Sequence, residues 1–200
     1  MSSTYRPGYK WGDYQEPAVE KTIRSILKPG DTFVDAGANI GFYTVLASKL
    51  VGDQGWVLAF EMIPDTARIL ASHVQHNECR NAAVVEGALG ETAGKKVVAT
   101  LVDGKSGQSS IASEKGNIKP EVTTITLADK LQHIPEVDLI KMDLEGAELG
   151  ALRGLGSDLQ KVRAIIFENR GNRDVVEYLE QRGFDVTRLD GSNALAHREL

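Results

Sequence analysis

The chain has 200 residues, a length typical of one globular domain that buries a hydrophobic core without disulfide bonds. Its hydrophobic share of 42% and charged share of 26% are ordinary for a globular protein, and a single cysteine excludes an intrachain disulfide. With 23 Lys and Arg against 28 Asp and Glu, the net charge is −5, which argues against a nucleic-acid partner because phosphate backbones usually require a basic face.

The first residues contain no apolar signal region, and no segment reaches the length of a membrane span. We therefore expect a cytoplasmic protein without a membrane partner. The amino-terminal residues 1–30 include four aromatic side chains close together, Tyr5, Tyr9, Trp11 and Tyr14. We interpret residues 1–30 as an arm or lid, and residues 31–200 as the core of the same single domain.

Short apolar runs alternate with helical patterns along the chain. The runs that predict strands are Thr32–Ala36, Trp56–Glu61, Ala83–Ala88, Val137–Asp143 and Val162–Glu168. The segments that predict helices are Ile40–Val51, Pro64–Asn77, Gly146–Leu159 and Asn172–Gln181. This alternation predicts an α/β fold with a mostly parallel, doubly wound sheet.

Two regions depart from the alternation. Phe184–Leu189 and Ala194–Arg198 flank the turn signal Asp190-Gly191, which predicts an antiparallel hairpin at the end of the sheet. Residues 90–127 contain strand-like Lys96–Val102 and Val122–Leu127 around a loop rich in Gly and Ser. We expect this region to be an insertion that covers one edge of the sheet and the ligand.

The segment TFVDAGANIGFYT, residues 32–44, joins the first predicted strand to the first predicted helix. Asp35 lies at the carboxyl end of the strand, where doubly wound sheets bind ligands. Gly37 and Gly41 permit a tight turn and a close approach of the backbone to a ligand, and the following helix directs its positive end at an anion. A tight turn without a ligand is the structural alternative.

Two cofactors suit this loop. A nicotinamide dinucleotide usually requires a glycine where this chain has Asn39, because its pyrophosphate lies against bare backbone. S-adenosylmethionine carries cationic groups, which an aspartate before the glycines favours. Glu61, at the end of the second strand, is placed to accept hydrogen bonds from the ribose hydroxyls that both cofactors share. Asp35 and Asn39 therefore favour S-adenosylmethionine, and Glu61 does not discriminate.

The motifs FVDAGANIGFYT, VLAFEMIPDT, VVEGALGE, VDLIKMDLEGAELGALRG and AIIFEN occur in an order that resembles the FkbM family of S-adenosylmethionine-dependent methyltransferases. The resemblance covers residues 13–169 and implies a class I methyltransferase sheet of seven strands. It also implies methylation of a hydroxyl, often on a sugar or a secondary metabolite. One departure is Met62, where the family usually has a proline after the acid.

The resemblance also implies which residues bind the cofactor. Asp35, Gly37, Asn39 and Gly41 would surround its methionine part. Glu61 would hold the ribose, and Met62 would lie against the adenine. The residues that would border the adenine edge are Glu86, Gly87 and Ala88, and those that would close over the cofactor are Tyr14 and Glu16.

A second group of acids follows the fourth and fifth predicted strands. Asp143 ends the fourth strand, and Glu145 and Glu148 are expected in the first turn of the next helix. There the helix dipole stabilises acids, and Asp143 is a candidate N-cap. The alternative is chemistry, with Asp143 as the base that removes the acceptor's proton and Glu145 and Glu168 as further catalytic candidates.

Asp143, Glu168 and Asn169 also suggest a hard cation. Three oxygen ligands on adjacent strand ends suit Mg²⁺, which would lower the pKa of an acceptor hydroxyl. The family resemblance does not require a metal, and we do not favour one.

These patterns predict an S-adenosylmethionine-dependent O-methyltransferase that acts on a small-molecule or sugar-like acceptor. The rivals are an NAD-dependent oxidoreductase and a non-catalytic module that binds the cofactor. A nucleic-acid methyltransferase is disfavoured because Leu144-Glu145-Gly146 stands where enzymes of adenine and cytosine amino groups usually have a proline-proline-aromatic platform. The oligomeric state stays open.

Overall fold

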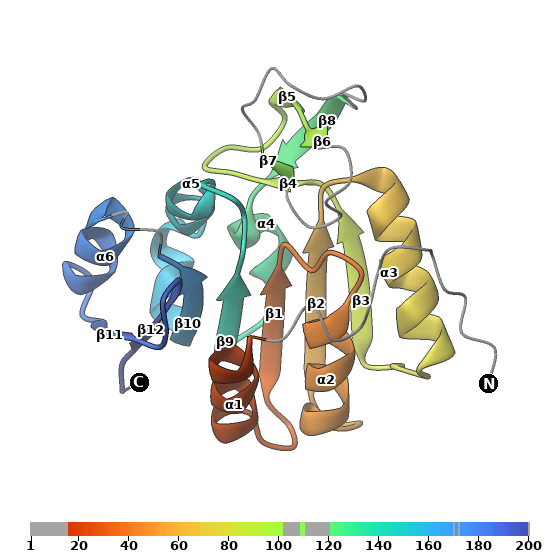
Figure 1. Cartoon of the computed structure of the whole chain (residues 1–200), viewed down its shortest axis with the longest axis horizontal. Helices are drawn as coiled ribbons and strands as arrows, with labels where there is room; N and C mark the ends of the chain where they lie inside the picture. Colours follow the sequence, from red (N-terminus) through yellow and green to blue (C-terminus); the bar gives the residue numbers. More distant parts are fainter. Residues whose placement is uncertain (1–15, 102–108, 111–120, 170, 172, 200) are drawn as a thin grey trace.

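Seven strands form the central layer of the protein. The computed structural model describes residues 16–101, 109–110, 121–169, 171 and 173–199. The strands of the central sheet are β1 (Thr32–Ala36), β2 (Trp56–Glu61), β3 (Ala82–Glu86), β9 (Val137–Met142), β10 (Val162–Glu168), β11 (Asp185–Arg188) and β12 (Asn193–His197). Their order is β11–β12–β10–β9–β1–β2–β3 (Figure 1).

The direction of the strands confirms the predicted fold class. β3, β2, β1, β9 and β10 run parallel, whereas β12 pairs antiparallel with both β10 and β11. The sheet is therefore doubly wound and mostly parallel, and it ends in the expected hairpin. Every residue of β9 is buried, as is usual for a parallel strand covered on both faces.

Two hydrophobic clusters lie on opposite faces of the sheet, because successive side chains of a strand alternate. Phe33 packs with α1 (Pro17–Ile26) and α2 (Phe42–Val51), while Val34 belongs to the cluster that includes α5 (Glu148–Arg153) and α6 (Arg173–Glu180). The other helices of the described residues are α3 (Pro64–His76), beside β3, and α4 (Leu127–Leu131) (Figure 1), together with the 3₁₀ helix η2 (Gly156–Lys161). No helix among the described residues is long and apolar enough to cross a membrane.

The predicted insertion forms a small second layer over the sheet. β4 (Ala88–Leu89), β5 (Lys96–Val98) and β8 (Glu121–Ile125) make a three-stranded sheet, and β6 (Thr100–Leu101) pairs with β7 (Ser109–Ser110). Figure 1 shows this layer above the carboxyl ends of β1, β2 and β9. The insertion thus covers the edge of the sheet where the sequence places the ligand.

Several element boundaries differ from the sequence predictions. The predicted strand Ala83–Ala88 is two strands, β3 and β4, because Gly87 turns the chain at a φ of 156°. The predicted helix Gly146–Leu159 begins only at Glu148 and is divided into α5 and η2, with Gly156 at a left-handed φ of 54°. The helix α1 within residues 1–30 was not predicted.

Candidate active site

The loop between β1 and α2 has a left-handed backbone at three positions, of which only Asn39 is not a glycine. Gly37, Asn39 and Gly41 have φ angles of 82°, 51° and 95°. A Cβ on Gly37 would lie 2.0 Å from the Asp143 carbonyl oxygen, and one on Gly41 would lie 2.4 Å from the Leu70 Cδ1. Glycine is therefore required at position 37 by a backbone contact, and it is favoured at position 41 by the left-handed φ angle, in addition to the ligand approach that the sequence suggests.

Asp35 lies beneath this loop, on the face of the sheet that α2 covers. Its side chain is fully buried, and its Oδ2 accepts a hydrogen bond of 2.6 Å from the Thr44 hydroxyl. Its Oδ1 has no hydrogen-bond partner among the described atoms. Burial raises the pKa of Asp35, and the charge of Lys141 and the Thr44 hydrogen bond oppose that rise. Such an unpaired buried oxygen is costly unless a ligand or a water satisfies it.

Glu61 connects the glycine loop to the start of α3. Its Oε2 accepts a hydrogen bond of 2.9 Å from the Asn39 amide, and its Oε1 accepts one of 2.9 Å from the Ile63 amide. The side chain is 6% exposed, and burial raises its pKa against the opposing effect of these amides. The Met62 amide is a third donor to this carboxylate, which still leaves it acceptor capacity, so the proposed ribose contact is compatible with this geometry.

The other residues assigned to the cofactor lie around Glu61. Met62 is half-buried beside an apolar cluster, and Ala88, 1% exposed, lies inside that cluster. Glu86 is exposed at the end of β3, and the Gly87 amide donates a hydrogen bond of 3.0 Å to the Glu61 carbonyl oxygen. The Ala88 side chain is thus part of the core of the insertion. Tyr14 lies outside the described residues.

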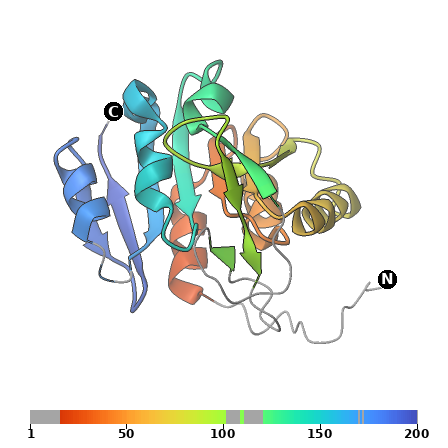
Figure 2. The ribbon, with the colours of Figure 1, turned by 90° about the horizontal axis from the view of Figure 1, so that it is seen from above.

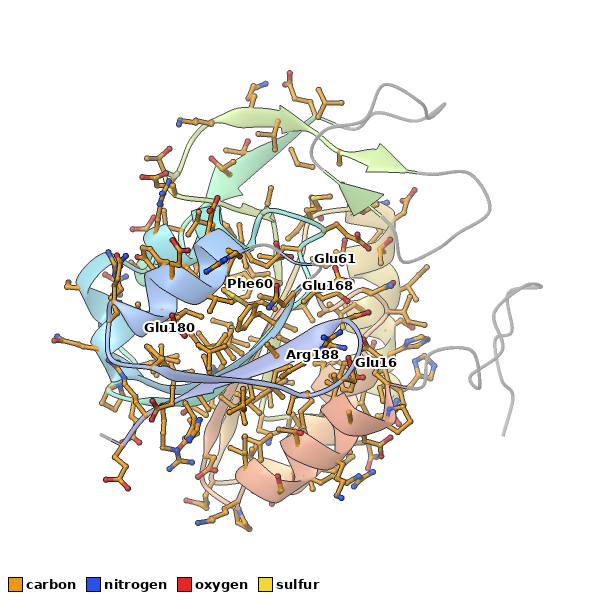
Figure 3. The ribbon with its side chains drawn as sticks, turned by 60° about the vertical axis from the view of Figure 1, so that its left-hand side comes forward. Glu16, Phe60, Glu61, Glu168, Glu180 and Arg188 are labelled. Atoms are coloured by element: carbon orange, nitrogen blue, oxygen red, sulfur yellow. The ribbon has the colours of Figure 1, made fainter. Side chains whose placement is uncertain are left out.

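Glu16 connects three parts of the structure. Its Oε2 accepts a hydrogen bond of 3.1 Å from the Tyr43 hydroxyl on α2, and its Oε1 accepts one of 2.9 Å from the side-chain Nδ2 of Asn193 at the start of β12. Figure 3 shows Glu16 beside the turn of the β11–β12 hairpin, near Arg188. The structure thus places Glu16 where α1, α2 and the hairpin meet.

Three acids gather at the carboxyl ends of β9 and β10. One carboxylate oxygen from each of Asp143, Glu145 and Glu168 lies within 4.8 Å of the other two. Among the described residues this is the one group of three or more side chains whose spacing suits a metal ion. Figure 3 shows Glu168 and Glu61 at the same edge of the sheet beneath the insertion, and β9 and β1 lie between their strands, β10 and β2. The structure therefore brings together all three catalytic candidates.

The predicted helical position of Glu145 is wrong. Ala147 is the N-cap of α5, and Glu145 lies before it with a left-handed φ of 51°. Glu148 is 3% exposed, and its Oε1 accepts hydrogen bonds from the amides of Leu144 (2.9 Å) and Gly146 (3.3 Å). Glu148 thus stabilises the turn, as the structural interpretation expected. Asp143 is not the N-cap.

Lys141 is the residue of this site that the sequence analysis missed. It is the cross-strand neighbour of Asp35 in the parallel pairing of β1 and β9, and it is 6% exposed. Its Nζ lies 3.3 Å from the Asp143 Oδ2 and 5.2 Å from the centre of the Tyr43 ring. Burial lowers the pKa of Lys141, but the charges of Asp143, Asp35 and Glu16 outweigh burial and raise it, so the side chain is an ammonium. A lysine inside an apolar strand was the available signal, since lysine is rarely buried without a partner.

A seven-stranded sheet of this order, with an antiparallel strand near its end and acids at the carboxyl ends of β1, β2 and β9, defines a class I methyltransferase. Residues 35–186 match the methyltransferase FkbM domain, so the chain belongs to that family. It is an S-adenosylmethionine-dependent methyltransferase. Family membership thus favours S-adenosylmethionine over the dinucleotide alternative.

Known relatives agree with this assignment. The chain is 29% identical over 199 residues to the methyltransferase sdnD of Sordaria araneosa, covering 80% of this chain and 76% of the relative. It is 34% identical over 98 residues to the ribosomal RNA large subunit methyltransferase E of Acinetobacter baumannii, covering 49% of this chain and 42% of that one. The solved methyltransferase FkbM from Methylobacillus flagellatus KT has a TM-score of 0.59 at 15% identity, covering 90% of this chain and 50% of that one, and shows the shared fold.

Proposed function

We propose that this protein transfers a methyl group from S-adenosylmethionine to a hydroxyl of a small-molecule or sugar-like acceptor. The observation that carries the proposal is the convergence of Asp143, Glu145 and Glu168, with oxygens within 4.8 Å, beside the glycine loop that follows β1. Methyl transfer to oxygen requires alignment of the acceptor and removal of its proton. Carboxylates at this place supply both a base and hydrogen-bond acceptors.

The residues near the loop fit S-adenosylmethionine. When bound, this cofactor supplies a methyl group on a sulfonium. The unpaired buried oxygen of Asp35 suits a cationic ligand, directly or through water. Asp35, Gly37, Asn39 and Gly41 are the proposed contacts of its methionine part, and Glu61 is the proposed contact of the ribose.

The rest of the proposed cofactor site comes from the insertion side and from the amino-terminal segment. Met62, Glu86 and Gly87 border the adenine in this proposal, and Ala88 supports them from the apolar cluster. Tyr14 and Glu16 close the site. Because Glu16 is hydrogen-bonded to Tyr43 and Asn193, it fixes where residues 1–15 join the core.

Asp143 is the proposed base. Its Oδ2 lies 3.3 Å from the Lys141 ammonium, which orients the carboxylate, while its side chain stays 30% exposed and accessible to an acceptor. Glu145 and Glu168 accept hydrogen bonds from neighbouring hydroxyls of the acceptor in this arrangement. Several carboxylates at one place favour a polyhydroxylated acceptor and disfavour a phosphate-rich one.

We propose that catalysis needs no metal ion. The Lys141 ammonium already compensates part of the charge of Asp143, which weakens the acidic group as a magnesium site. Treatment with EDTA is expected to leave methyl transfer unchanged. If EDTA abolishes transfer and Mg²⁺ restores it, the three acids hold a metal and this part of the proposal is wrong.

The acceptor is tested with S-adenosylmethionine that carries a radioactive methyl group. The panel contains sugars, polyols, hydroxylated aromatic and polyketide-like compounds, and ribosomal RNA. We expect transfer to a hydroxylated small molecule and none to RNA. Transfer to RNA alone would contradict the proposed acceptor class, and cofactor binding without transfer to any compound would favour a non-catalytic module.

A further inference from the structure

Asp35 and Lys141 are buried side chains of opposite charge on neighbouring central strands of the sheet. They are direct neighbours in the register of β1 and β9, on the face covered by α1 and α2. Asp35 is fully buried and Lys141 is 6% exposed. An isolated charge in such a place is costly, so the positive charge of Lys141 favours the ionised form of Asp35.

One ammonium serves two carboxylates here. The Lys141 Nζ contacts the Asp143 Oδ2 at 3.3 Å, and its charge also counteracts the rise in the pKa of Asp35 that burial causes. The two carboxylates differ in their access to water, because the Asp143 side chain is 30% exposed and Asp35 is fully buried. If Lys141 were removed, Asp35 would lose the positive charge that opposes the effect of burial, so it would take up a proton more readily.

A neutral Asp35 would lose its function toward a cationic ligand. Its Oδ2 already accepts the hydrogen bond of Thr44, and its Oδ1 is the oxygen without a partner among the described atoms. A proton on this carboxyl removes the negative charge that attracts an ammonium or a sulfonium. The identity of residue 141 would therefore affect cofactor affinity through residue 35.

We propose that Lys141 is a positioning residue of the cofactor site, the buried counter-ion that keeps Asp35 ionised for binding. The inference rests on the proposed cofactor contacts of Asp35. Lys141 itself touches neither cofactor nor acceptor in this arrangement. In this proposal Lys141 affects cofactor affinity only through Asp35. Once Asp35 has been changed, a change of Lys141 should therefore have no further effect on affinity, and a double-mutant cycle measures this.

The test measures affinity for S-adenosylhomocysteine by calorimetry, with thermal unfolding recorded in parallel. Lys141→Met and Asp35→Asn are each expected to weaken binding by at least about tenfold, and the double variant is expected to bind no more weakly than either. Lys141→Arg keeps the charge and is expected to stay within about fivefold of the wild type. The matched control is Lys161→Met, which removes a half-buried lysine paired with Asp158 in η2, at 3.0 Å, and is expected to bind as the wild type does.

The double variant also covers the case in which Lys141→Met does not fold. Because the double variant removes the charges of both Lys141 and Asp35, it leaves no unpaired charge between β1 and β9. Its affinity is then compared with that of Asp35→Asn, and equal affinities support the proposal. Wild-type affinity in Lys141→Met, or a double variant at least about tenfold weaker than Asp35→Asn, overturns it. A wild-type protein that does not bind S-adenosylhomocysteine would contradict the proposed function itself, which separates the two failures.

Discussion

At the scale of single residues, the site is built from carboxylates that the fold removes from water. Glu61 and Asp35 are both buried, and burial raises the pKa of each. Hydrogen bonds from backbone amides offset the cost of burying the Glu61 carboxylate. A hydroxyl and a neighbouring ammonium offset the same cost for Asp35. Glycines with left-handed φ angles above them let the loop lie directly on these groups. Each feature leads to a measurable effect.

Asp143→Asn separates binding from chemistry. The variant keeps the shape of the site and loses the basic oxygen, so we expect affinity for S-adenosylhomocysteine within about threefold of the wild type and a turnover at least about 100-fold lower. The measurement combines calorimetry with methyl transfer to the acceptor found in the panel. Asp129→Asn, an exposed aspartate on α4, is the control and should change neither quantity. Near-normal turnover in Asp143→Asn would remove the base assignment.

Glu61 is expected to make stability depend on pH. In the folded chain the pKa of Glu61 lies above its ordinary value of 4.5. Between pH 4.5 and this raised pKa, the folded chain therefore binds more protons than the unfolded chain. Its contribution to the unfolding free energy therefore falls as pH rises from 4.5 through the raised pKa. Glu61→Gln lacks this decline and should gain stability relative to the wild type over the same window, by about 1.4 kcal/mol for each unit of pKa shift.

Chemical unfolding of both proteins across the pH range measures this difference. Taking the difference between wild type and variant cancels the effect of the other titrating groups. A difference that stays constant with pH would show that the pKa of Glu61 is the same in the folded and unfolded chains.

Gly37→Ala tests the close approach of the loop to Asp143. The new Cβ would lie 2.0 Å from a carbonyl oxygen at a φ of 82°, so we expect a loss of about 2–4 kcal/mol in unfolding free energy. Gly30→Ala is matched in φ, at 96°, but has no atom within 4 Å of the new Cβ. It should lose only about 1 kcal/mol. Equal losses in the two variants would mean that the contact with Asp143 contributes nothing.

The sequence identifies residues that stand at strand ends better than residues that meet across strands. Asp35, Glu61, Asp143 and Glu168 each follow an apolar run, so their common location follows from the fold class alone. Lys141 was missed because its role depends on the register of β1 and β9, which places it beside Asp35. The left-handed turn at Glu145 was missed because no local pattern distinguishes it from the first turn of a helix.

At the scale of elements, the amino-terminal helix is part of the core. Val19 and Ile23 of α1 are fully buried against α2 and the sheet, and Glu16 holds the start of the helix through Tyr43 and Asn193. The apolar stripe of this helix is short, so the sequence alone suggested only an arm. A lid function remains a prediction for residues 1–15, which lie outside the described part of the chain.

Ile23→Ala tests the contribution of α1 to the fold. Removing a fully buried side chain leaves a cavity, so we expect the unfolding free energy to fall by about 2–5 kcal/mol. Arg24→Ala, next in the same helix, removes an exposed side chain that pairs with Glu20 and should stay within about 0.5 kcal/mol of the wild type. A small effect of Ile23→Ala, equal to that of the control, would mean that α1 is loosely attached.

The boundaries of the other elements depend on contacts that a single segment does not contain. Gly154 follows α5 where an added Cβ would lie 2.2 Å from the Gly90 carbonyl oxygen, and this contact between distant segments accompanies the division into α5 and η2. Gly87 likewise divides β3 from β4 because the chain leaves the central sheet for the insertion there. Strand existence was predictable from apolar runs, whereas these breaks were not.

At the scale of the whole molecule, the sheet order and the insertion create one place for chemistry. Parallel strands bring the ends of β1, β2, β9 and β10 to the same edge, and the insertion lies over that edge (Figures 1 and 2). The net charge of −5 and the three clustered acids are the observations behind our proposal of a hydroxylated acceptor in place of a polyanion. The fold was predictable from the alternation of strands and helices. We expect the walls of the acceptor site to include residues 102–108 and 111–120, which lie outside the described residues.

Identifying the atom that receives the methyl group tests the proposed transfer to a hydroxyl most directly. The wild-type protein is given its acceptor and S-adenosylmethionine labelled with ¹³C in the methyl group, and the product is examined by two-dimensional NMR. We predict that the labelled carbon is the carbon of a methoxy group formed on a former hydroxyl of the acceptor. A labelled methyl on nitrogen, sulfur or carbon would contradict it.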